Sequence, residues 1–159
     1  MAMADLRELV EGLGHEDVVT HIQSGNVVFR ASSRSAEKVA EGIEKALADD
    51  LGFETAVMVR TAADLKAILA ARPFTDAAPA ALHVAFCRHE PDAERAAALA
   101  PPEGSPDECA LIGREVLLHL PSGMGRTKLN GAYLERRLGV PVTARNWKVV
   151  TALQELASG

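Results

Sequence analysis

The sequence predicts an α+β protein made of two halves that share the element order β-α-β-β-α-β, of which the first lacks its initial strand. Short runs of alternating apolar residues, typical of strands, are interspersed with longer segments whose apolar residues recur at helical spacing. Turn-forming glycine and proline residues separate these segments. The length of 159 residues, 48% of them hydrophobic, allows a hydrophobic core without disulfide bonds.

The first half is expected to span residues 1–61 and to begin with a helix over 3–13. Gly14 follows as a C-terminal cap of this helix, whose apolar side carries Met3, Leu6, Val10 and Leu13. Two strand-like runs, 18–22 and 27–30, then flank a cluster of turn-forming residues. These runs predict an antiparallel hairpin.

A second helix is predicted from the capping residue Ser35 to about Leu51, where Gly52 ends it. Residues 55–60, Thr-Ala-Val-Met-Val-Arg, follow with the pattern of a strand. In a β-α-β-β-α-β sheet the first strand lies between the third and the fourth, so its absence leaves backbone groups without partners. The chain must therefore rearrange, borrow a strand from another copy, or carry an exposed sheet edge.

A connector over residues 62–81 is expected to contain a helix over 62–71, which Pro73 stops, and a loop. The second half, residues 82–159, then begins with a strand over 82–88. A short helix over 92–99 follows, and after it comes a loop that contains Pro101, Pro102, Gly104 and Pro106.

Residues 108–112 and 115–120 are predicted to form a hairpin that turns at Gly113 and Arg114. The remaining predicted elements are a helix over 127–138 ended by Gly139, a short strand over 141–145 and a C-terminal helix over 148–157. Residues 82–145 thus have the β-α-β-β-α-β order of ferredoxin-like folds. Two ferredoxin-like halves are expected, the first of them incomplete.

Charge is distributed unevenly along the chain. The formal net charge is −5, but residues 121–159 carry six basic and only two acidic side chains. An acidic protein is a poor non-specific binder of duplex nucleic acid, whereas a basic C-terminal quarter leaves room for a site that binds a small anion. The alternative is a solvated helix face that contains Arg136 and Arg137.

The two cysteines, Cys87 and Cys109, do not form a CxxC pair and adjoin apolar runs. Both are expected to be buried, reduced side chains of a cytoplasmic protein. The five histidines lack the spacing of zinc ligands, so neither a metal nor a cofactor is predicted. No run approaches the ~20 apolar residues of a membrane span, and the N-terminus lacks a signal-peptide pattern.

The segment from Pro121 to Leu129 is the most suggestive of ligand binding, because it leads from a predicted strand into a predicted helix. Its glycines would let a ligand approach the backbone, and its basic side chains would attract a phosphate or a carboxylate. The candidate ligand-binding residues are Ser122, Gly123, Gly125, Arg126, Thr127 and Lys128. Lysine and threonine stand in the wrong order for a P-loop. The alternative is a plain turn with Thr127 as the helix cap.

Arg145, Asn146 and Trp147 are further candidates for ligand binding. The single tryptophan of the chain lies between two basic residues, Arg145 and Lys148, and could stack on a ring while they bind a phosphate. The alternative is a core tryptophan whose indole N–H binds a carbonyl.

A second polar cluster comprises His21, Gln23, Ser24 and Asn26 at the end of a predicted strand. A histidine and a serine suggest nucleophilic catalysis, but no carboxylate is positioned by the sequence to orient His21, and no GxSxG motif is present. The alternative is a turn, and the catalytic residues remain unassigned.

Three of these segments together resemble an uncharacterised bacterial family, domain of unknown function 1697. The resemblance rests on residues 21–29, on 121–130, and on 143–147 with Val150 and Thr151. It implies an α+β fold of ferredoxin-like halves, but no reaction, substrate or cofactor. Members usually open with a strand and a loop of the type Arg-Gly-Ile-Asn-Val-Gly-Gly, whereas residues 3–6 match only the family's segment after that loop. A site to which the loop contributes would therefore be incomplete here.

Two classes of function fit the sequence best. The first is binding of a small phosphorylated or anionic ligand at residues 121–128. The second is a non-catalytic structural or interaction role, with a homo-oligomer formed through the incomplete sheet. An enzyme that uses the His21 cluster fits less well, and so does a binder of single-stranded nucleic acid, because only 4% of the residues are aromatic.

Overall fold

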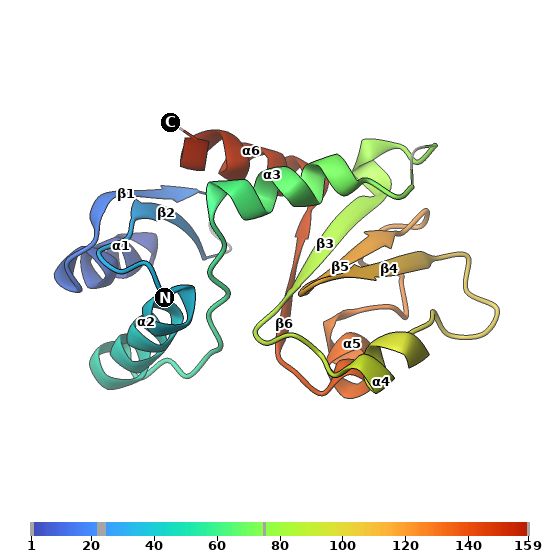
Figure 1. Cartoon of the computed structure of the whole chain (residues 1–159), viewed down its shortest axis with the longest axis horizontal. Helices are drawn as coiled ribbons and strands as arrows, with labels where there is room; N and C mark the ends of the chain where they lie inside the picture. The colour runs from blue at the N-terminus through green and yellow to red at the C-terminus, as the bar shows by residue number, and fades with distance from the viewer. Residues whose placement is uncertain (1, 22–24, 75, 159) are drawn as a thin grey trace. The chain divides into compact units, whose positions relative to one another are not determined.

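The computed structural model describes all residues except 1, 22–24, 75 and 159, and it is a mixed α/β fold (Figure 1). The described residues form two sheets and six α-helices. Two compact units are distinguished: unit 1 comprises residues 1–65 and 153–159, and unit 2 comprises residues 66–152. The division falls inside the helix that the sequence assigns to a connector.

Unit 1 contains a two-stranded antiparallel sheet and two helices. Its elements are α1 (Met3–Gly12), β1 (Glu16–His21), β2 (Asn26–Arg30) and α2 (Ala36–Leu51). The Ser35 hydroxyl accepts a hydrogen bond from the Lys38 amide at 3.2 Å, so the predicted cap of α2 is confirmed. Gly52 ends this helix in the left-handed conformation, at φ 62°. The hairpin is confirmed, and β1 begins two residues earlier than predicted.

The core of unit 1 is formed by apolar side chains of α1, β1 and α2. Its buried members are Leu6, Val10, Val18, Val39, Ile43 and Leu47. Val27 and Phe29 of β2 pack against this core but are only partly buried. The two residues are two positions apart, so they lie on the same face of the hairpin.

The prediction of a strand over residues 55–60 is wrong. This segment has no regular secondary structure, and β1 and β2 are the two strands of the only sheet found among the described residues of unit 1. A strand needs a neighbour that donates to and accepts from its backbone. Here the Val57 amide donates instead to Glu44 Oε2 of α2, at 2.8 Å. The alternation of apolar residues in this segment does indicate which side chains face the core, since Val57 and Val59 pack against it.

Unit 2 contains a four-stranded sheet in which every neighbouring pair is antiparallel. Its strands are β3 (Leu82–Cys87), β4 (Glu108–Ile112), β5 (Glu115–His119) and β6 (Val142–Asn146). They lie in the order β4-β5-β3-β6, so the first strand of the unit is central. The predicted turn of the β4–β5 hairpin is confirmed, with Gly113 at φ 63°.

Helices flank this sheet in the predicted order. They are α3 (Ala62–Ala71), a short 3-10 helix η1 (Pro79–Ala81), α4 (Ala93–Ala98), α5 (Gly131–Leu138) and α6 (Trp147–Ser158). The prediction that α5 begins at Thr127 is wrong. The Asn130 carboxamide oxygen accepts the Tyr133 amide at 3.0 Å, so Asn130 caps this helix, and Gly139 ends it at φ 73°.

The two faces of the unit 2 sheet carry different partners. Ala85, Cys87, Val116 and Leu118 belong to the core that also contains Leu134 and Leu138 of α5, and we call this side the α5 face. The side chains between them in sequence, including Val84, Phe86 and Leu117, point to the opposite face and are buried as well. Figure 1 shows α4 and α5 on one side of this sheet and α3 and α6 on the other, so we call the second side the α6 face.

Candidate functional site

The β5–α5 loop, residues 121–130, is fixed at both ends and open in the middle. Leu120, just before it, and Leu129, near its end, are both 0% exposed and belong to the core on the α5 face. The Gly123 amide donates to the Leu120 carbonyl at 2.9 Å, and Gly123 has φ 85°, a value that favours glycine. The loop therefore has a defined shape although most of its length is exposed.

Thr127 helps to hold the loop in place. Its hydroxyl donates a short hydrogen bond to Asp107 Oδ2, and the same oxygen accepts the Leu129 amide at 2.9 Å. Asp107 is only 6% exposed, so the threonine hydroxyl also provides a donor to a buried carboxylate. Thr127 thus neither caps α5 nor offers a free hydroxyl to a ligand.

Several donors of the loop are available to solvent. Within the described part of the chain, the amides of Met124, Gly125, Thr127 and Lys128 make no hydrogen bond. A Cβ built on Gly123 or Gly125 would meet no atom within 4 Å, so the backbone is approachable at both glycines. Free amides next to unobstructed backbone are the donors that bind phosphates and carboxylates in proteins.

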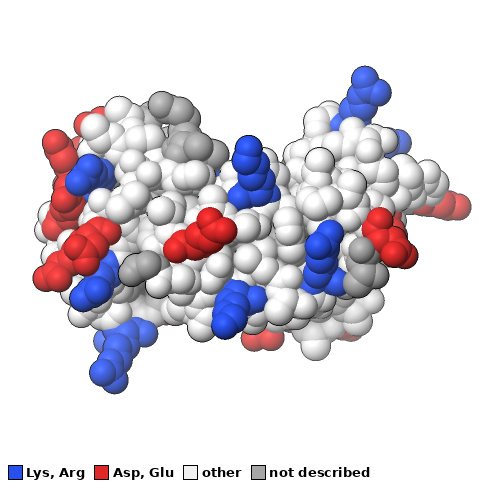
Figure 2. Space-filling model, turned by 90° about the horizontal axis from the view of Figure 1, so that it is seen from above, with Lys and Arg blue, Asp and Glu red and all other residues white. Residues whose placement is uncertain are grey.

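The loop is also locally basic. Arg126 and Lys128 are exposed, and residues 121–130 include no Asp or Glu. On the face drawn in Figure 2, Lys and Arg side chains alternate with Asp and Glu and do not form a continuous patch. A local basic loop of this kind suits a small anion better than a long polyanion.

Arg145 does not join the β5–α5 loop. In the sheet Arg145 is the register partner of Val84, whereas Ala144, the residue before it, pairs with Ala85 and packs in the core on the α5 face. Successive residues of a strand point to opposite faces, so Arg145 lies on the α6 face and the loop lies on the other. Its guanidinium donates to Thr143 Oγ1 at 2.7 Å and to the Ala144 carbonyl at 2.9 Å. Burial lowers the pKa of Arg145.

Asn146 and Trp147 form the junction between β6 and α6. The Asn146 carboxamide oxygen accepts the Val149 amide at 2.8 Å, so Asn146 acts as the N-terminal cap of α6. Trp147 is half-buried, and the Arg72 guanidinium carbon lies 5.9 Å from the centre of its ring. A cation over an aromatic face stabilises the fold without any ligand.

The second polar cluster is only partly described. Gln23 and Ser24 lie outside the described residues, whereas His21 ends β1 and Asn26 begins β2. The Asn26 side-chain amide donates to the His21 carbonyl at 3.3 Å, which closes the hairpin end. Within the described part of the chain, no carboxylate forms a hydrogen bond or an ion pair with the His21 ring.

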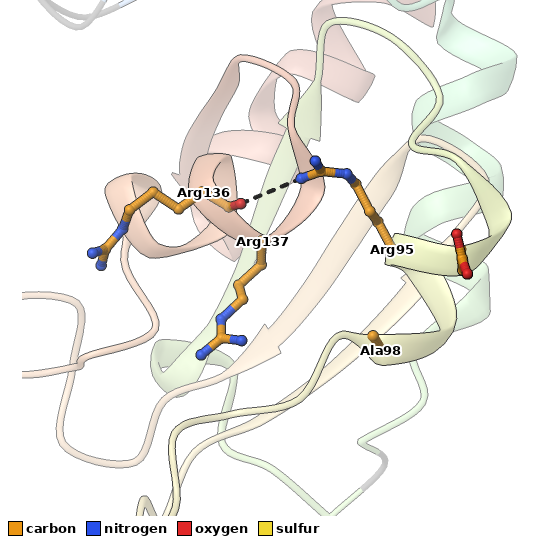
Figure 3. Close-up of a pocket in the computed structure, with 5 residues that line it drawn as sticks. Arg95, Ala98, Arg136 and Arg137 are labelled. Carbon is orange, nitrogen blue, oxygen red and sulfur yellow. Dashed lines mark hydrogen bonds between the residues drawn. The ribbon is translucent and has the colours of Figure 1, made fainter.

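An arginine-lined hollow between α4 and α5 was not predicted from the sequence. It has a volume of about 420 Å³ and is lined by Glu94, Arg95, Ala98, Arg136 and Arg137. Figure 3 shows Arg95 Nη1 directed at the Arg136 carbonyl, at 3.5 Å, while the side chains of Arg136 and Arg137 diverge. The Arg137 guanidinium lies over the Tyr133 ring. The adjacent arginines of α5 were visible in the sequence, but nothing there indicated that Arg95 would approach them.

His83 is a second feature that the sequence did not reveal. It lies in β3 on the α5 face, with Leu118 and Asn146 as register partners. Its Nδ1 atom is buried and makes no hydrogen bond within the described part of the chain. Burial lowers the pKa of this imidazole, so the neutral form is favoured.

The cysteines and the other potential metal ligands are dispersed through the fold. Outside positions 1, 22–24, 75 and 159, no three His, Cys, Asp or Glu side chains gather where they could hold a metal ion. Nor is any described helix both long and apolar enough to cross a bilayer. Cys87 is buried and Cys109 half-buried in the core on the α5 face, and neither takes part in a disulfide bond within the described residues. Burial raises the pKa of Cys109.

Comparison with known proteins identifies the family. A family model described as protein of unknown function (DUF1697) matches residues 1–117, so the β5–α5 loop lies beyond the matched part. No curated protein matches the chain. Among solved structures, a conserved bacterial protein of Streptococcus pneumoniae, SP0830, is similar with a TM-score of 0.74 and 20% identity, over 100% of this chain and 90% of that one. That similarity shows a shared fold, and because the family model spans most of the chain, this protein is a member of the DUF1697 family.

Proposed function

We propose that unit 2 binds a small anionic ligand, a phosphoryl or carboxylate group, at the β5–α5 loop. The observation that carries the proposal is the set of amides at Met124, Gly125, Thr127 and Lys128, which make no hydrogen bond within the described part of the chain. Four donors on one short loop, next to approachable glycine backbone, match the several acceptor oxygens of such a group.

The two exposed basic side chains contribute in different ways. Arg126 can form two parallel hydrogen bonds to a phosphoryl or carboxylate group, which fixes its orientation, whereas Lys128 acts as a point charge. Arg145, Asn146 and Trp147 are left out of the proposed site, because the first lies on the α6 face and the others form the junction to α6. The proposed activity is binding, and no catalytic step is assigned.

The proposal also concerns the architecture of the two units. The strand order β4-β5-β3-β6, with every neighbour antiparallel, supports a complete ferredoxin-like arrangement for unit 2. The sequence of elements in unit 1 supports an incomplete version of the same arrangement. A non-catalytic interaction role is the second candidate function, and the two-stranded sheet of unit 1 favours it, because such a small sheet leaves open edges.

The binding proposal is tested by titration with inorganic phosphate, pyrophosphate and a nucleoside monophosphate, followed by ³¹P and amide NMR. We expect shifts of the amide signals of residues 124–128 and a dissociation constant that Arg126→Ala weakens about tenfold, the loss expected for one charge-assisted contact. The control variants are Lys66→Ala, an exposed lysine of α3, and Arg145→Lys, on the α6 face; both should bind like the natural chain.

Two results would contradict the proposal. One is a set of loop amide signals that do not respond to any of the three anions at millimolar concentration. The other is equal weakening by Arg126→Ala and Lys66→Ala, which would show diffuse attraction by surface charge in place of a defined site.

A further inference from the structure

The hollow between α4 and α5 brings together arginines from two helices. Arg95 lies on α4, and Arg136 and Arg137 lie in the last turn of α5. The volume of about 420 Å³ is typical of sites that bind small molecules. The lining contains no large apolar side chain, so the hollow suits a polar ligand. Figure 3 shows the Arg136 side chain leading away from Arg95, so a ligand in the hollow would meet chiefly the guanidinium groups of Arg95 and Arg137.

Three contacts orient the Arg95 guanidinium. Its Nη1 atom donates to the Arg136 carbonyl at 3.5 Å, and its Nε atom lies 3.5 Å from Asp92 Oδ2. A Cβ built on Gly139 would lie 3.1 Å from the guanidinium carbon, so the group packs against the bare Cα of this glycine. The Nη2 atom has no hydrogen-bond partner within the described part of the chain. Arg95 therefore presents donors to a ligand from a defined orientation.

An aromatic ring orients Arg137. The guanidinium carbon of Arg137 lies 5.1 Å from the centre of the Tyr133 ring. The Tyr133 hydroxyl donates to the Ala100 carbonyl at 2.7 Å, which holds the ring in place. Among the described residues, none forms a hydrogen bond or an ion pair with the Arg137 side chain. All of its donors are therefore open, and the stacked side chain has less conformational freedom to lose when a ligand binds.

The hollow has a positive charge that its own residues only partly neutralise. Three of its five lining residues are arginines and one, Glu94, is acidic. Asp92 contacts Arg95, but no carboxylate of the described residues forms an ion pair with Arg136 or Arg137. Because charges from two helices act on the same space, an anion in the hollow is attracted by both.

We propose that this hollow binds a small molecule with two anionic groups, carboxylate or phosphoryl, one of them on Arg95 and the other on Arg137. A guanidinium group binds either kind of anion with two parallel hydrogen bonds. A ligand that reaches both arginines gains the second contact without a second loss of translational freedom, so it binds more tightly than a ligand with one such group. The site is separate from the β5–α5 loop, which lies at the opposite end of α5.

The test is a titration of the full chain with citrate and pyrophosphate, compared with acetate and inorganic phosphate at equal ionic strength. The readout is the ring NMR signals of Tyr133, the single tyrosine of the chain, which Arg137 covers. We expect citrate or pyrophosphate to bind at least tenfold more tightly than either control anion, and the tighter of the two identifies the anionic group. The amide signals of residues 124–128 report on the β5–α5 loop in the same samples, so failure at one site is distinguishable from failure at the other.

Variants with opposite expected effects test the assignment of the residues. Arg95→Gln and Arg137→Gln should each weaken binding about tenfold, the loss expected for one charge-assisted contact. Glu94→Gln removes the acidic lining residue and should tighten binding about threefold. The matched control is Arg34→Gln, an exposed arginine of unit 1, which should bind like the natural chain. Arg137→Gln changes an exposed side chain without hydrogen bonds, so its fold should be retained even if Arg95→Gln loosens α4.

Three results would overturn the proposal. The first is a set of Tyr133 ring signals that do not shift with millimolar citrate or pyrophosphate. The second is equal affinity for acetate, phosphate and the two larger anions, which would show that Arg95 and Arg137 do not act on one ligand. The third is equal weakening by Arg137→Gln and Arg34→Gln, which would show attraction by surface charge in general.

Discussion

Replacing Gly139 by alanine tests how α5 ends and how α4 is attached to it. Gly139 has φ 73°, where an L-residue with a Cβ is strained by about 1–2 kcal/mol. The added Cβ would also lie 2.9 Å from Arg95 Nη1 and 3.1 Å from its Cζ. Because Arg95 is a flexible, exposed side chain, it can move away, and its hydrogen bond to the Arg136 carbonyl is then lost.

We therefore expect Gly139→Ala to lower the free energy of unfolding by about 1–2 kcal/mol, most of it from backbone strain. The assay is urea unfolding followed by circular dichroism, repeated in an Arg95→Ala background. In that background about 1 kcal/mol of the loss should remain, since the strain does not depend on Arg95. Gly139→Asn is the matched control, because asparagine tolerates this conformation better than alanine does.

The reasoning fails if Gly139→Ala has no effect on the natural background, since the left-handed conformation would then not be required. It also fails if the Arg95→Ala background abolishes the loss completely. That outcome would assign the whole effect to the steric contact and none to the backbone.

Three further predictions concern residues of unit 2 and, for the pH dependence, also His15 of unit 1. Asn146→Ala removes the cap of α6 and should lower the free energy of unfolding, measured by urea unfolding, by about 1 kcal/mol. Asn146→Asp retains a side-chain acceptor and should keep most of the stability that the cap provides. Thr127→Val leaves the buried Asp107 carboxylate without its hydroxyl donor and should lower the free energy of unfolding by about 2 kcal/mol. Thr127→Ser keeps the hydroxyl and should be nearly as stable as the natural chain. Equal losses of stability in the two variants would contradict a role for this hydrogen bond. Burial lowers the pKa of His83 and of His15 below the ordinary 6.5, so the unfolded chain binds more protons in that window. Stability should therefore be complete above pH 6.5 and fall as the pH drops below it, and His83→Phe should flatten that fall in a series of thermal unfolding curves.

Local chemistry made the helices and turns of this chain predictable. Ser35 caps the helix that the sequence assigned to it, and Gly52, Gly113 and Gly139 adopt the left-handed conformations expected of glycine. These features depend on contacts between residues close in sequence. All the interacting partners lie within a few positions of one another.

Two predicted elements were wrong, the start of α5 at Thr127 and the strand over residues 55–60. In both cases the outcome depended on a residue or a strand distant in the sequence. Thr127 and Asn130 are both good helix caps, and the helix was predicted to begin at Thr127, but the Thr127 hydroxyl binds Asp107, twenty residues earlier. Residues 55–60 have the alternation of a strand but no neighbour with which to pair. Alternation reports which side chains are buried, while strand formation also requires a second backbone.

The candidate site could be located only in part. The loop from Ser122 to Lys128 was selected for its glycines and basic residues, and four of its amides, those of Met124, Gly125, Thr127 and Lys128, make no hydrogen bond within the described residues. Arg145 was grouped with it because both segments are basic. Sheet register decides that Arg145 points to the other face, and register between β3 and β6 is set by residues about sixty positions apart. The approach of Arg95 to α5 is equally non-local.

The central position of β3 has a consequence for how the protein is synthesised. β3 leaves the ribosome before either of its neighbours, since β5 begins at Glu115 and β6 ends at Asn146. During translation both sides of this apolar strand are unpaired until β5 has emerged, and the side that β6 covers stays unpaired until residues 142–146 follow. A nascent chain arrested before Val142 should therefore expose the β6-facing edge of β3, an unpaired apolar edge to which a chaperone or another strand can bind.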